Sequence, residues 1–455
     1  MNLRQKPASK NSLYALIVVI IFVISGIWLR GVNGFGKSPS NIGDKKVPPI
    51  IPPTVAARTD AVIPDPNWIN VKNYGASGDG KSNDTTAIQK AINDAGKGEI
   101  VYIPPGDYQI DAVRSLNLKS GTTLRMSPEA VLRAIPNAAP HYAILAVTSV
   151  ENVQITGGVL VGERYKHFGF GGEWGMGIRI IGAKDIEIRG TTCNEFWGDG
   201  IYIGETTGGK PSENIRIIDL QADANRRQGI SLISGRNVEI VGGRITNTQG
   251  TAPAAGIDIE PNQARNVLEN IRIQDLYTAG NQGAGVLISP GAISGAQNPI
   301  SIMIINHRDE NSDRGMQISS KGIIPGRVSI DSPLWRNAKR NAVVIQSHDH
   351  RSFQIQIKSA VIIDANQNSR GAAIDIYRLK NTQPSENGGI GNVEVDNPVI
   401  ADTRDQPQTI AAFSIWDLPG YEICKLTIVN PVLKGNLAKL ILQNDAQAFV
   451  RYPQK

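Results

Sequence analysis

The sequence predicts an all-β solenoid in which short parallel strands stack coil upon coil, and three observations support this prediction. A phrase of two short strands occurs three times between Asp185 and Glu260, and its second strand recurs at regular steps from Gly200 to Ile376. The step is about 28 residues, within the range typical of repeat architectures. Within each strand apolar and polar residues alternate, which is the pattern of a strand with one buried face and one face in solvent. No helical pattern separates the strands, which excludes leucine-rich, ankyrin and tetratricopeptide arrays.

The length of the repeat favours a β-helix over a propeller. A propeller blade needs about 40 residues in four antiparallel strands. A coil of roughly 28 residues suits a solenoid, in which each strand stacks on its copy one turn earlier. The core of this single-stranded parallel β-helix is then a column of inward-facing aliphatic residues. The column consists of Ile203, Leu232, Ile259, Ile288, Ile318, Ile345 and Ile376.

The composition narrows the classes of partner. A net charge of +6 and a pI of about 9.1 favour an acidic partner, such as a uronic-acid polysaccharide, a phospholipid surface or nucleic acid. Because no run of Lys and Arg is interleaved with aromatic residues, nucleic-acid binding is not predicted. The two cysteines, Cys193 and Cys424, lie far apart in the sequence and form no disulfide framework.

The segment before the β-helix is predicted to comprise residues 1–66. Residues 1–12 form a basic cytoplasmic tail, and Leu13 to Leu29 is an uncharged apolar stretch that we expect to be a transmembrane signal-anchor. A cleaved signal peptide is the alternative. Residues 30–66 are a Pro/Gly-rich linker, and residues 67–455 are the β-helix domain. Basic residues ahead of the apolar stretch predict a membrane-anchored protein with a periplasmic or extracellular body.

A short amphipathic helix is predicted from Thr85 to about Asp94, close to the start of the folded domain at Trp68. Its apolar face carries Ala87, Ile88, Ala91 and Ile92. Because a solenoid must cover its open end, we expect this N-terminal capping helix to lie over the first coil.

The same region carries a family resemblance. The residues concerned are Tyr74-Gly75-Ala76-x-Gly78-Asp79-Gly80, Asn83-Asp84-Thr85 and Tyr102-Ile103-Pro104-Pro105-Gly106. This opening resembles that of the pectate-lyase-like superfamily, which includes polygalacturonases, rhamnogalacturonan-cleaving enzymes, mannuronan C5-epimerases and phage tailspikes. The resemblance implies a right-handed parallel β-helix that grips a polysaccharide along its long face. It leaves the chemistry open, because fold alone does not give function.

Two carboxylates are predicted to share one coil of the outward face. The outward column consists of Tyr202, Ser231, Asp258, Leu287 and Gln317, and Glu260 follows Asp258 on the same face. Side chains at i and i+2 lie about 6.5–7 Å apart, near the separation of about 6.5–9.5 Å that inverting glycoside hydrolysis requires. The alternative is a pair of solvated acids, or acids bound to a neighbouring arginine.

Two corners that lead into these strands carry charge. Asp199 follows Trp197-Gly198 and resembles, loosely, the Asp-Gly step of polygalacturonases, while the alternative is a corner aspartate that binds backbone amides. Arg226 and Arg227 occupy the equivalent corner of the next coil. Arginine there binds a uronate carboxylate, acts as the base of a lyase, or forms a salt bridge with Asp258.

The loop from Glu163 to Trp174 interrupts the coil before these strands and is rich in aromatic, charged and glycine residues. We expect it to form a wall over a sugar groove. His167 is a candidate proton carrier, or an ordinary surface residue. Trp174 and Trp197 are expected to stack on sugar rings or to plug a corner. The residues predicted to bind substrate are Tyr202, Ser231, Arg226, Lys166, His167, Glu173, Trp174 and Trp197.

The reaction type stays open at this stage. The Gly-Asp-Asp and Gly-His-Gly signatures of polygalacturonases are absent, as is the Asp-Pro-His step of the epimerases. Arg378-Leu379-Lys380 has the form of the Arg-x-Lys signature, but it lies about four coils beyond Asp258, or roughly 20 Å away. We expect first an exported enzyme that hydrolyses an acidic polysaccharide. Its predicted catalytic residues are Asp258, Glu260, Asp199 and Arg227.

Two alternatives remain beside hydrolysis. Within the enzymes, the alternative is a polysaccharide lyase, with Arg227 or Lys166 as base, or a C5-epimerase. The second class is a non-catalytic glycan-binding β-helix, such as an adhesin or an exopolysaccharide-assembly factor. No cofactor and no metal site are predicted, except that Ca²⁺ is expected if the reaction is that of a lyase.

Overall fold

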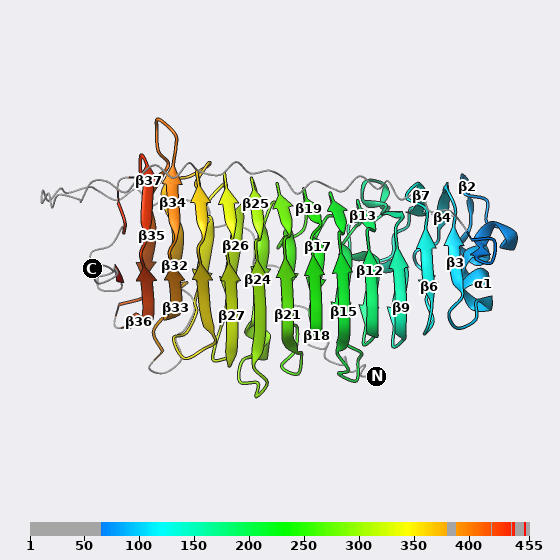
Figure 1. The fold of residues 1–455 in the computed structure, drawn as a ribbon, viewed down its shortest axis with the longest axis horizontal. Coiled ribbons are helices and arrows are strands. Elements are labelled where there is room, and N and C mark those ends of the chain that lie inside the picture. Colours follow the sequence, from blue (N-terminus) through cyan, green and yellow to red (C-terminus); the bar gives the residue numbers. More distant parts are fainter. Residues whose placement is uncertain (1–64, 380–387, 420, 438, 442–449, 452–455) are drawn as a thin grey trace, which may run out of the picture. The chain divides into compact units, whose positions relative to one another are not determined.

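The computed structural model shows a solenoid of parallel strands. The structure describes residues 65–379, 388–419, 421–437, 439–441 and 450–451, all within the second of two compact units, Ile51–Lys455. In Figure 1 the strands of each coil lie beside those of the next along the length of this unit. The strands form three parallel sheets of 14, 13 and 11 strands, which we call sheets A, B and C. The predicted all-β parallel β-helix is confirmed.

Each full coil contributes one strand to each sheet. Sheet A consists of β1 (Ile69–Asn70), β3 (Ile100–Ile103), β6 (Thr123–Met126), β9 (Glu151–Thr156), β12 (Lys184–Arg189), β15 (Ser212–Ile218), β18 (Gly235–Val241), β21 (Leu268–Gln274), β24 (Ile300–Ile305), β27 (Gly326–Asp331), β30 (Gln354–Lys358), β33 (Gly391–Asp396), β36 (Cys424–Val429) and β38 (Val450–Arg451). Sheet B consists of β2 (Asp79–Asn83), β4 (Gly106–Ile110), β7 (Ala130–Ala134), β10 (Val159–Val161), β13 (Thr192–Asn194), β16 (Gln221–Asp223), β19 (Arg244–Thr246), β22 (Tyr277–Ala279), β25 (Arg308–Glu310), β28 (Leu334–Arg336), β31 (Val361–Ile363), β34 (Val399–Asp402) and β37 (Val432–Gly435). Sheet C consists of β5 (Leu116–Asn117), β8 (His141–Thr148), β11 (Trp174–Ile181), β14 (Asp199–Gly204), β17 (Gln228–Leu232), β20 (Ala255–Ile259), β23 (Ala284–Ile288), β26 (Arg314–Ser319), β29 (Val343–Gln346), β32 (Gly371–Tyr377) and β35 (Thr409–Trp416).

The sequence predicted two strands per coil, and the third, in sheet B, is a correction. Many strands of this sheet are very short, with a single buried side chain such as Cys193, Ala222 or Ile245. One buried residue between two half-buried ones gives too little alternation for a pattern search to detect.

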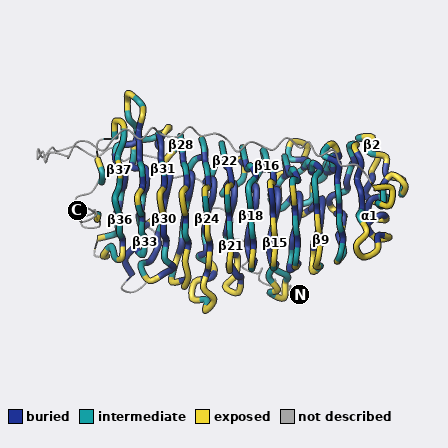
Figure 2. Tube along the Cα trace, viewed as in Figure 1, coloured by how far each residue is buried: buried dark blue, intermediate teal, exposed yellow. Residues whose placement is uncertain are grey.

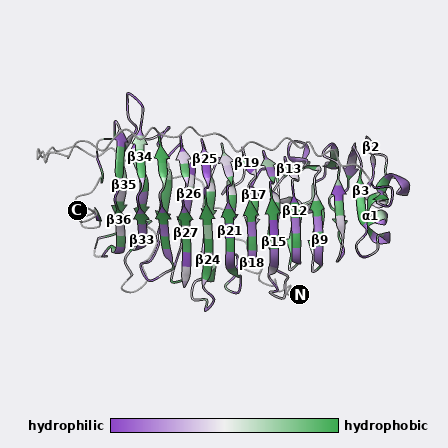
Figure 3. Cartoon of the chain, in the orientation of Figure 1, coloured by the Kyte–Doolittle hydropathy of each residue, from purple (hydrophilic) through white to green (hydrophobic). Residues whose placement is uncertain are grey.

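The predicted inward column is the core of sheet C. Ile203, Leu232, Ile259, Ile288, Ile318, Ile345 and Ile376 pair in register from coil to coil, and each is at most 1 % exposed. Apolar bands that continue from strand to strand are visible in Figure 3, and Figure 2 shows that exposed residues gather at the turns. Stacked aliphatic side chains therefore hold the coils together.

The predicted helix is present as α1, Thr85–Asp94, beside β3 at one end of the solenoid (Figure 1). Its buried residues Ile88, Ala91 and Ile92 belong to the same hydrophobic core as the strands. Three short 3₁₀ helices complete the elements: η1 (Val71–Tyr74), η2 (Arg164–Lys166) and η3 (Pro290–Ile293).

The predicted tail, the predicted anchor over Leu13–Leu29 and nearly all of the predicted linker lie outside the described residues. Of the helices that the structure describes, none has the length and apolarity needed to cross a bilayer.

Sheets A and C differ in how far their outward faces are exposed to solvent. Sheet A follows the sequence-based expectation, because outward residues such as Arg216 and Met303 are exposed. In sheet C the expectation of a solvated outward face is wrong at its centre, where Ser231 and Asp258 are 0 % exposed. Polar side chains from consecutive coils hydrogen-bond across this part of the sheet and cover one another, as described next.

Candidate active site

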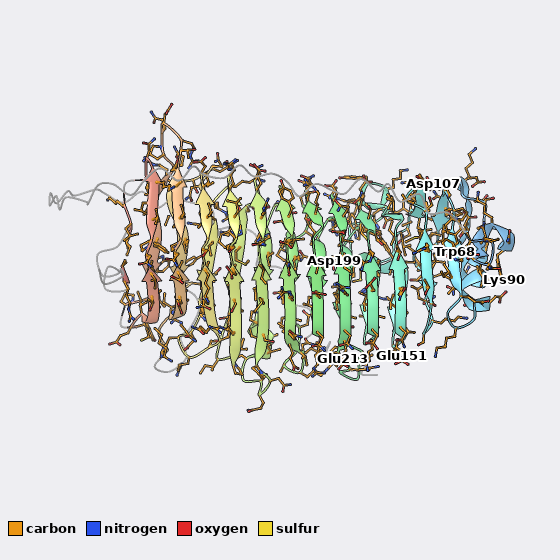
Figure 4. The ribbon with its side chains drawn as sticks, in the orientation of Figure 1. Trp68, Lys90, Asp107, Glu151, Asp199 and Glu213 are labelled. Atoms are coloured by element: carbon orange, nitrogen blue, oxygen red, sulfur yellow. The ribbon has the colours of Figure 1, made fainter. Side chains whose placement is uncertain are left out.

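Three neighbouring strands of sheet C bring most of the predicted catalytic residues together. Tyr202 of β14, Ser231 of β17 and Asp258 of β20 pair in register, and Asp199 lies at the start of β14. Glu260 follows β20, and its backbone N–H donates to Leu232 O at 3.2 Å, so the ladder continues through this residue. Figure 4 places Asp199 near the middle of the solenoid, away from the edge that carries Glu151 and Glu213.

In β14 and β17 the first side chain of the strand reaches the outward residue of the next strand in sheet C. Ser231 Oγ donates to Asp199 Oδ2 at 2.9 Å, and Gln228 Nε2 donates to Asp258 Oδ2 at 2.9 Å. Gln228 Oε1 also accepts from the backbone N–H of Ala255 at 3.0 Å. Sequence reasoning missed Gln228, although its position directly before the recurring glycine is the same as that of Asp199.

Asp199 therefore accepts hydrogen bonds from side chains and not from backbone amides, which corrects the alternative considered for this corner. Its Oδ2 receives Ser231 Oγ and Arg227 Nη1, the latter at 3.3 Å. The Oδ1 atoms of Asp199 and Asp258 are buried and have no hydrogen-bond partner among the described residues. Buried polar atoms are normally satisfied, so each of these two oxygens lacks a partner that a water or a ligand would supply.

Arg227 is the only cation that contacts this group of acids at close range in the described part of the chain. Besides Asp199, its Nε lies 3.9 Å from Glu173 Oε2. Burial opposes its charge, but the carboxylates of Asp199, Asp258, Glu173 and Glu260 together raise the pKa of Arg227. The close ion pair thus forms with Asp199 and not, as one alternative had it, with Asp258.

Burial raises the pKa of both buried aspartates. The pKa of Asp199 rises to about 6, although Arg227 and Ser231 work in the opposite direction. For Asp258 burial is again the main cause of a raised pKa, and the charge of Glu260 adds to it. A carboxyl group held protonated near neutral pH is what a general acid requires.

The loop before β11 stands beside these carboxylates. Arg164 Nη2 donates to Gln249 O at 2.7 Å, and Arg226 Nη1 donates to Gly172 O at 3.2 Å, so two arginines tie the loop to later coils. Glu173 is the loop residue that reaches Arg227. Lys166 is exposed, and so are three aromatic rings of this loop, namely Tyr165, Phe168 and Phe170.

His167 is not an ordinary surface residue. Its side chain is only 1 % exposed, its Nδ1 lies 3.0 Å from Glu163 Oε1, and its ring stacks on that of Trp197 at 4.0 Å. The guanidinium of Arg226 lies 3.6 Å from the centre of the Trp197 ring, and must occupy the other face. Both faces of Trp197 are therefore covered by protein, which corrects the expectation that it stacks on a sugar ring.

Trp174 packs in an aromatic pair, and Arg378 of the Arg-x-Lys segment forms a buried ion pair. Trp174 begins β11 and stacks on the in-register His141 of β8, with ring centres 4.6 Å apart. Arg378 is buried in an ion pair with Asp417, at 2.5 Å, and Lys380 lies outside the described residues.

Within the ranges that the structure describes, no three His, Cys, Asp or Glu side chains are arranged to hold a metal ion. The acids around Asp199 and Asp258 instead surround a guanidinium, that of Arg227.

Comparisons with known proteins agree with this architecture. Residues 68–301, just over half of the chain, match the model of the family described as rhamnogalacturonase A/epimerase, pectate lyase-like. The uncharacterized protein YclG of Bacillus subtilis is 26 % identical over 85 % of this chain and 80 % of its own length. The chain spans 32 % and 26 % of the length of two other curated relatives.

Two solved structures share the fold. The A-module of the mannuronan C-5 epimerase AlgE4 of Azotobacter vinelandii has a TM-score of 0.63 and 17 % identity, over 85 % of this chain and 100 % of that one. The surface protein and adhesin PfbA of Streptococcus pneumoniae has a TM-score of 0.60 and 16 % identity, over 85 % of this chain and 99 % of that one. At such identities the likeness concerns the fold alone.

Proposed function

The chain belongs to the rhamnogalacturonase A/epimerase, pectate lyase-like family, and on that premise we propose that it is an exported enzyme that hydrolyses glycosidic bonds of an acidic polysaccharide. The resemblance inferred from the sequence, with the right-handed parallel β-helix that it implied, is confirmed by this membership. The net charge of +6 favours a substrate with negative charges.

The observation that carries the proposal is the buried carboxyl of Asp258, whose pKa burial raises and whose neighbour on the same face is Glu260. In this mechanism Asp258 gives its proton to the oxygen of the leaving sugar. Glu260 takes a proton from the attacking water, which becomes bonded to the anomeric carbon as the glycosidic bond breaks. Asp199 is the third acid of the set, and Arg227 holds its carboxylate.

The electrostatics favour hydrolysis over β-elimination with Arg227 as the base. A base must be deprotonated before it can accept a proton from the substrate. Four carboxylates raise the pKa of Arg227, so its guanidinium stays charged. The remaining lyase base, Lys166, lies on the exposed side of the loop. Arg227 is better suited to holding Asp199 in place and to binding a uronate carboxylate.

One observation favours a non-catalytic glycan-binding protein as the second candidate. Asp199 and Asp258 are 0 % exposed, and the side chain of Arg227 that covers Asp199 is 14 % exposed. A substrate reaches these carboxyls only if the covering side chains turn aside. A closed network of this kind also suits a static support beneath a binding surface.

Export is proposed from the sequence alone. The apolar stretch from Leu13 to Leu29, preceded by basic residues, supports a body held outside the cytoplasm by a membrane anchor.

The test is to incubate the full-length protein with a panel of acidic and neutral polysaccharides and to follow two signals. New reducing ends without ultraviolet absorbance indicate hydrolysis. Both signals together indicate a lyase, since β-elimination leaves an unsaturated uronate. If neither signal appears while a glycan still binds, the binding candidate replaces the enzyme.

Matched variants connect the activity to the site. Asp258→Asn and Glu260→Gln keep the shape of each side chain and remove its acid–base function, so we expect a loss of about 100-fold or more in turnover with binding retained. The control is Glu213→Gln, because Glu213 is an ion-paired acid of sheet A, 2.6 Å from Arg236 and away from Asp199 (Figure 4). Unchanged turnover in Asp258→Asn removes this site from consideration.

A further inference from the structure

Sheet C carries a second charged cluster that is built on the same positions as the first. Arg340 occupies the corner position of Arg227, four coils further along sheet C. The strand registers align residue 227 with residue 254 of the next coil, and then with 283, 313 and 340. Asp375 occupies the outward position of Asp258, through Leu287, Gln317 and Val344. In both clusters the arginine precedes the aspartate by one coil.

The two clusters are related by a simple shift along the sheet. Each member of the second lies four coils beyond its counterpart, and strands in a sheet are about 4.8 Å apart, so the clusters are about 19 Å apart. An extended polymer that lies along sheet C would meet both clusters, whereas a single sugar would meet only one.

Both clusters contain buried polar atoms without a hydrogen-bond partner among the described residues. The described residues contain 13 buried side-chain nitrogen and oxygen atoms without a hydrogen-bond partner. Six of them belong to residues in or beside the strands of sheet C: Arg179, Asp199, Arg227 and Asp258 around the first cluster, and Arg314 and Asp375 in the second. Because native structures rarely leave such atoms unsatisfied, they indicate that a polar ligand or water completes both places.

The charges of the two clusters differ in a way that suits different tasks. The first surrounds one arginine with four acids. In the second, Arg314 stands at the position of Asp199, and Arg314 and Arg340 share the carboxylate of Asp313, with Arg314 Nη1 at 2.6 Å from Oδ2 and Arg340 Nε at 2.7 Å from Oδ1. The first cluster therefore suits proton transfer, and the second supplies cations to hold an acidic sugar.

Two aromatic rings extend the second cluster. Tyr377 and Trp416 are in-register residues of β32 and β35, with ring centres 5.1 Å apart and planes at 13°, and both are half-buried. Tyr377 lies two positions beyond Asp375, on the same face of the sheet. The rings present an apolar edge with an O–H and an N–H donor, which is a typical surface for a sugar ring.

We propose that Arg314, Arg340, Tyr377 and Trp416 form a second glycan-binding site, which holds a carboxylate-bearing sugar of the same polymer whose bond is cleaved at Asp258. The proposal takes its class of ligand from the proposed function. If this second site exists, the affinity for a glycan depends on the length of the glycan, because a polymer engages both clusters and a disaccharide only one.

The test measures binding of polygalacturonate and polymannuronate, and of their disaccharides, by calorimetry with the full-length protein. In the titrations every protein also carries Asp258→Asn, so that the polymer is not cleaved. A parallel turnover assay uses the protein that retains Asp258. Arg340→Gln and Trp416→Ala remove one cation and one ring. The matched control is Arg216→Gln, because Arg216 of sheet A has a side chain 51 % exposed against 52 % for Arg340 and is likewise ion-paired with acids.

The second site predicts that Arg340→Gln and Trp416→Ala each bind the polymer about 10-fold or more weakly, so that its affinity approaches that of the disaccharide, while Arg216→Gln binds both normally. The proposal is overturned if Arg340→Gln, Trp416→Ala and Arg216→Gln bind the polymer equally well. It is also overturned if none of the proteins binds either uronan. Length-dependent binding without turnover in the protein that retains Asp258 contradicts the proposed hydrolysis and leaves the second site standing.

Discussion

Gln228 donates a hydrogen bond from Nε2 to Asp258 Oδ2 at 2.9 Å, from the strand directly before that of the aspartate. The bond stabilises the charged carboxylate in a place where burial and Glu260 favour the protonated acid. The same offset joins Asp199 to Ser231 one coil earlier. The geometry of the coil thus repeats the contact between the first residue of one strand and the outward residue of the next, while the residues that make this contact differ from coil to coil.

The first prediction concerns this donor. Gln228→Glu keeps the acceptor for the Ala255 amide but faces Asp258 with a second acid, so the pKa of Asp258 rises further. The alkaline limb of the pH–rate profile should move up by about 1 unit. Gln317→Glu is the control, because it adds the same charge to the outward column two coils away. A profile that does not move shows that Asp258 is not the titrating acid.

A second prediction concerns Arg227. Its replacement by Gln leaves the buried carboxylate of Asp199 without its cation, a change that typically costs about 3–5 kcal/mol. Burial holds the pKa of Asp199 at about 6, so at pH 5 the acid is mostly neutral and needs no cation. The fall in melting temperature should therefore be larger at pH 8 than at pH 5. An equal fall at both pH values would mean that Arg227 stabilises the fold through packing.

The repeat and its core could be predicted from the sequence because each coil places the same kind of residue at the same step. Ile203 and Leu232 recur on one face, and a column of aliphatic residues on one face indicates a buried core. The burial of Asp258 could not be predicted, because it depends on side chains from other coils that fold over it. Alternation within a strand reports which face a residue is on, and not what covers that face.

The contacts of the loop before β11 could not be predicted from the sequence, for a related reason. His167 and Trp197 are about one coil apart in the sequence, and Arg226 follows about one coil later still. The side chains of His167 and Arg226 nevertheless stack on the ring of Trp197, which lies between them. Nothing in the local pattern of any one segment indicates such a contact. The outward positions of Asp258 and Glu260 were predictable from their spacing, whereas a hydrogen-bond partner on the preceding strand required the register of the neighbouring coil.

A third prediction concerns stability. Asp309 lies inside the solenoid, where burial raises its pKa to about 7, although Thr278 and Ser312 both donate hydrogen bonds to Oδ2. The folded protein therefore binds a proton more tightly than the unfolded chain, and stability falls as pH rises from about 4 through 7. Asp309→Asn should remove this slope and should stabilise the protein at pH 8 by up to about 4 kcal/mol.

Asp402 provides the opposite control. Burial works against its charge, but hydrogen bonds from Arg404 and from the Thr409 backbone lower its pKa. Stability from this residue is present at neutral pH and is lost as pH falls, so Asp402→Asn should destabilise the protein at pH 8. Urea unfolding at pH 5 and pH 8 measures both changes. The interpretation fails if the two variants shift stability in the same direction at pH 8.

The last prediction concerns Gly229, the recurring glycine near the start of the repeated strand of sheet C. A Cβ built on Gly229 would lie 2.1 Å from Ile245 Cγ2 and 2.7 Å from Gly256 O, so the corner has no room for a methyl group. Because both neighbours belong to the stacked coils, Gly229→Ala should destabilise the fold by about 1–3 kcal/mol or more. Gly208→Ala is the control, since the nearest atom to its Cβ would be Thr206 Oγ1 at 3.8 Å. Thermal unfolding of the two variants gives the comparison. Equal melting temperatures would mean that the coils separate at little cost, and that the recurring glycine reflects something other than the close approach of neighbouring coils.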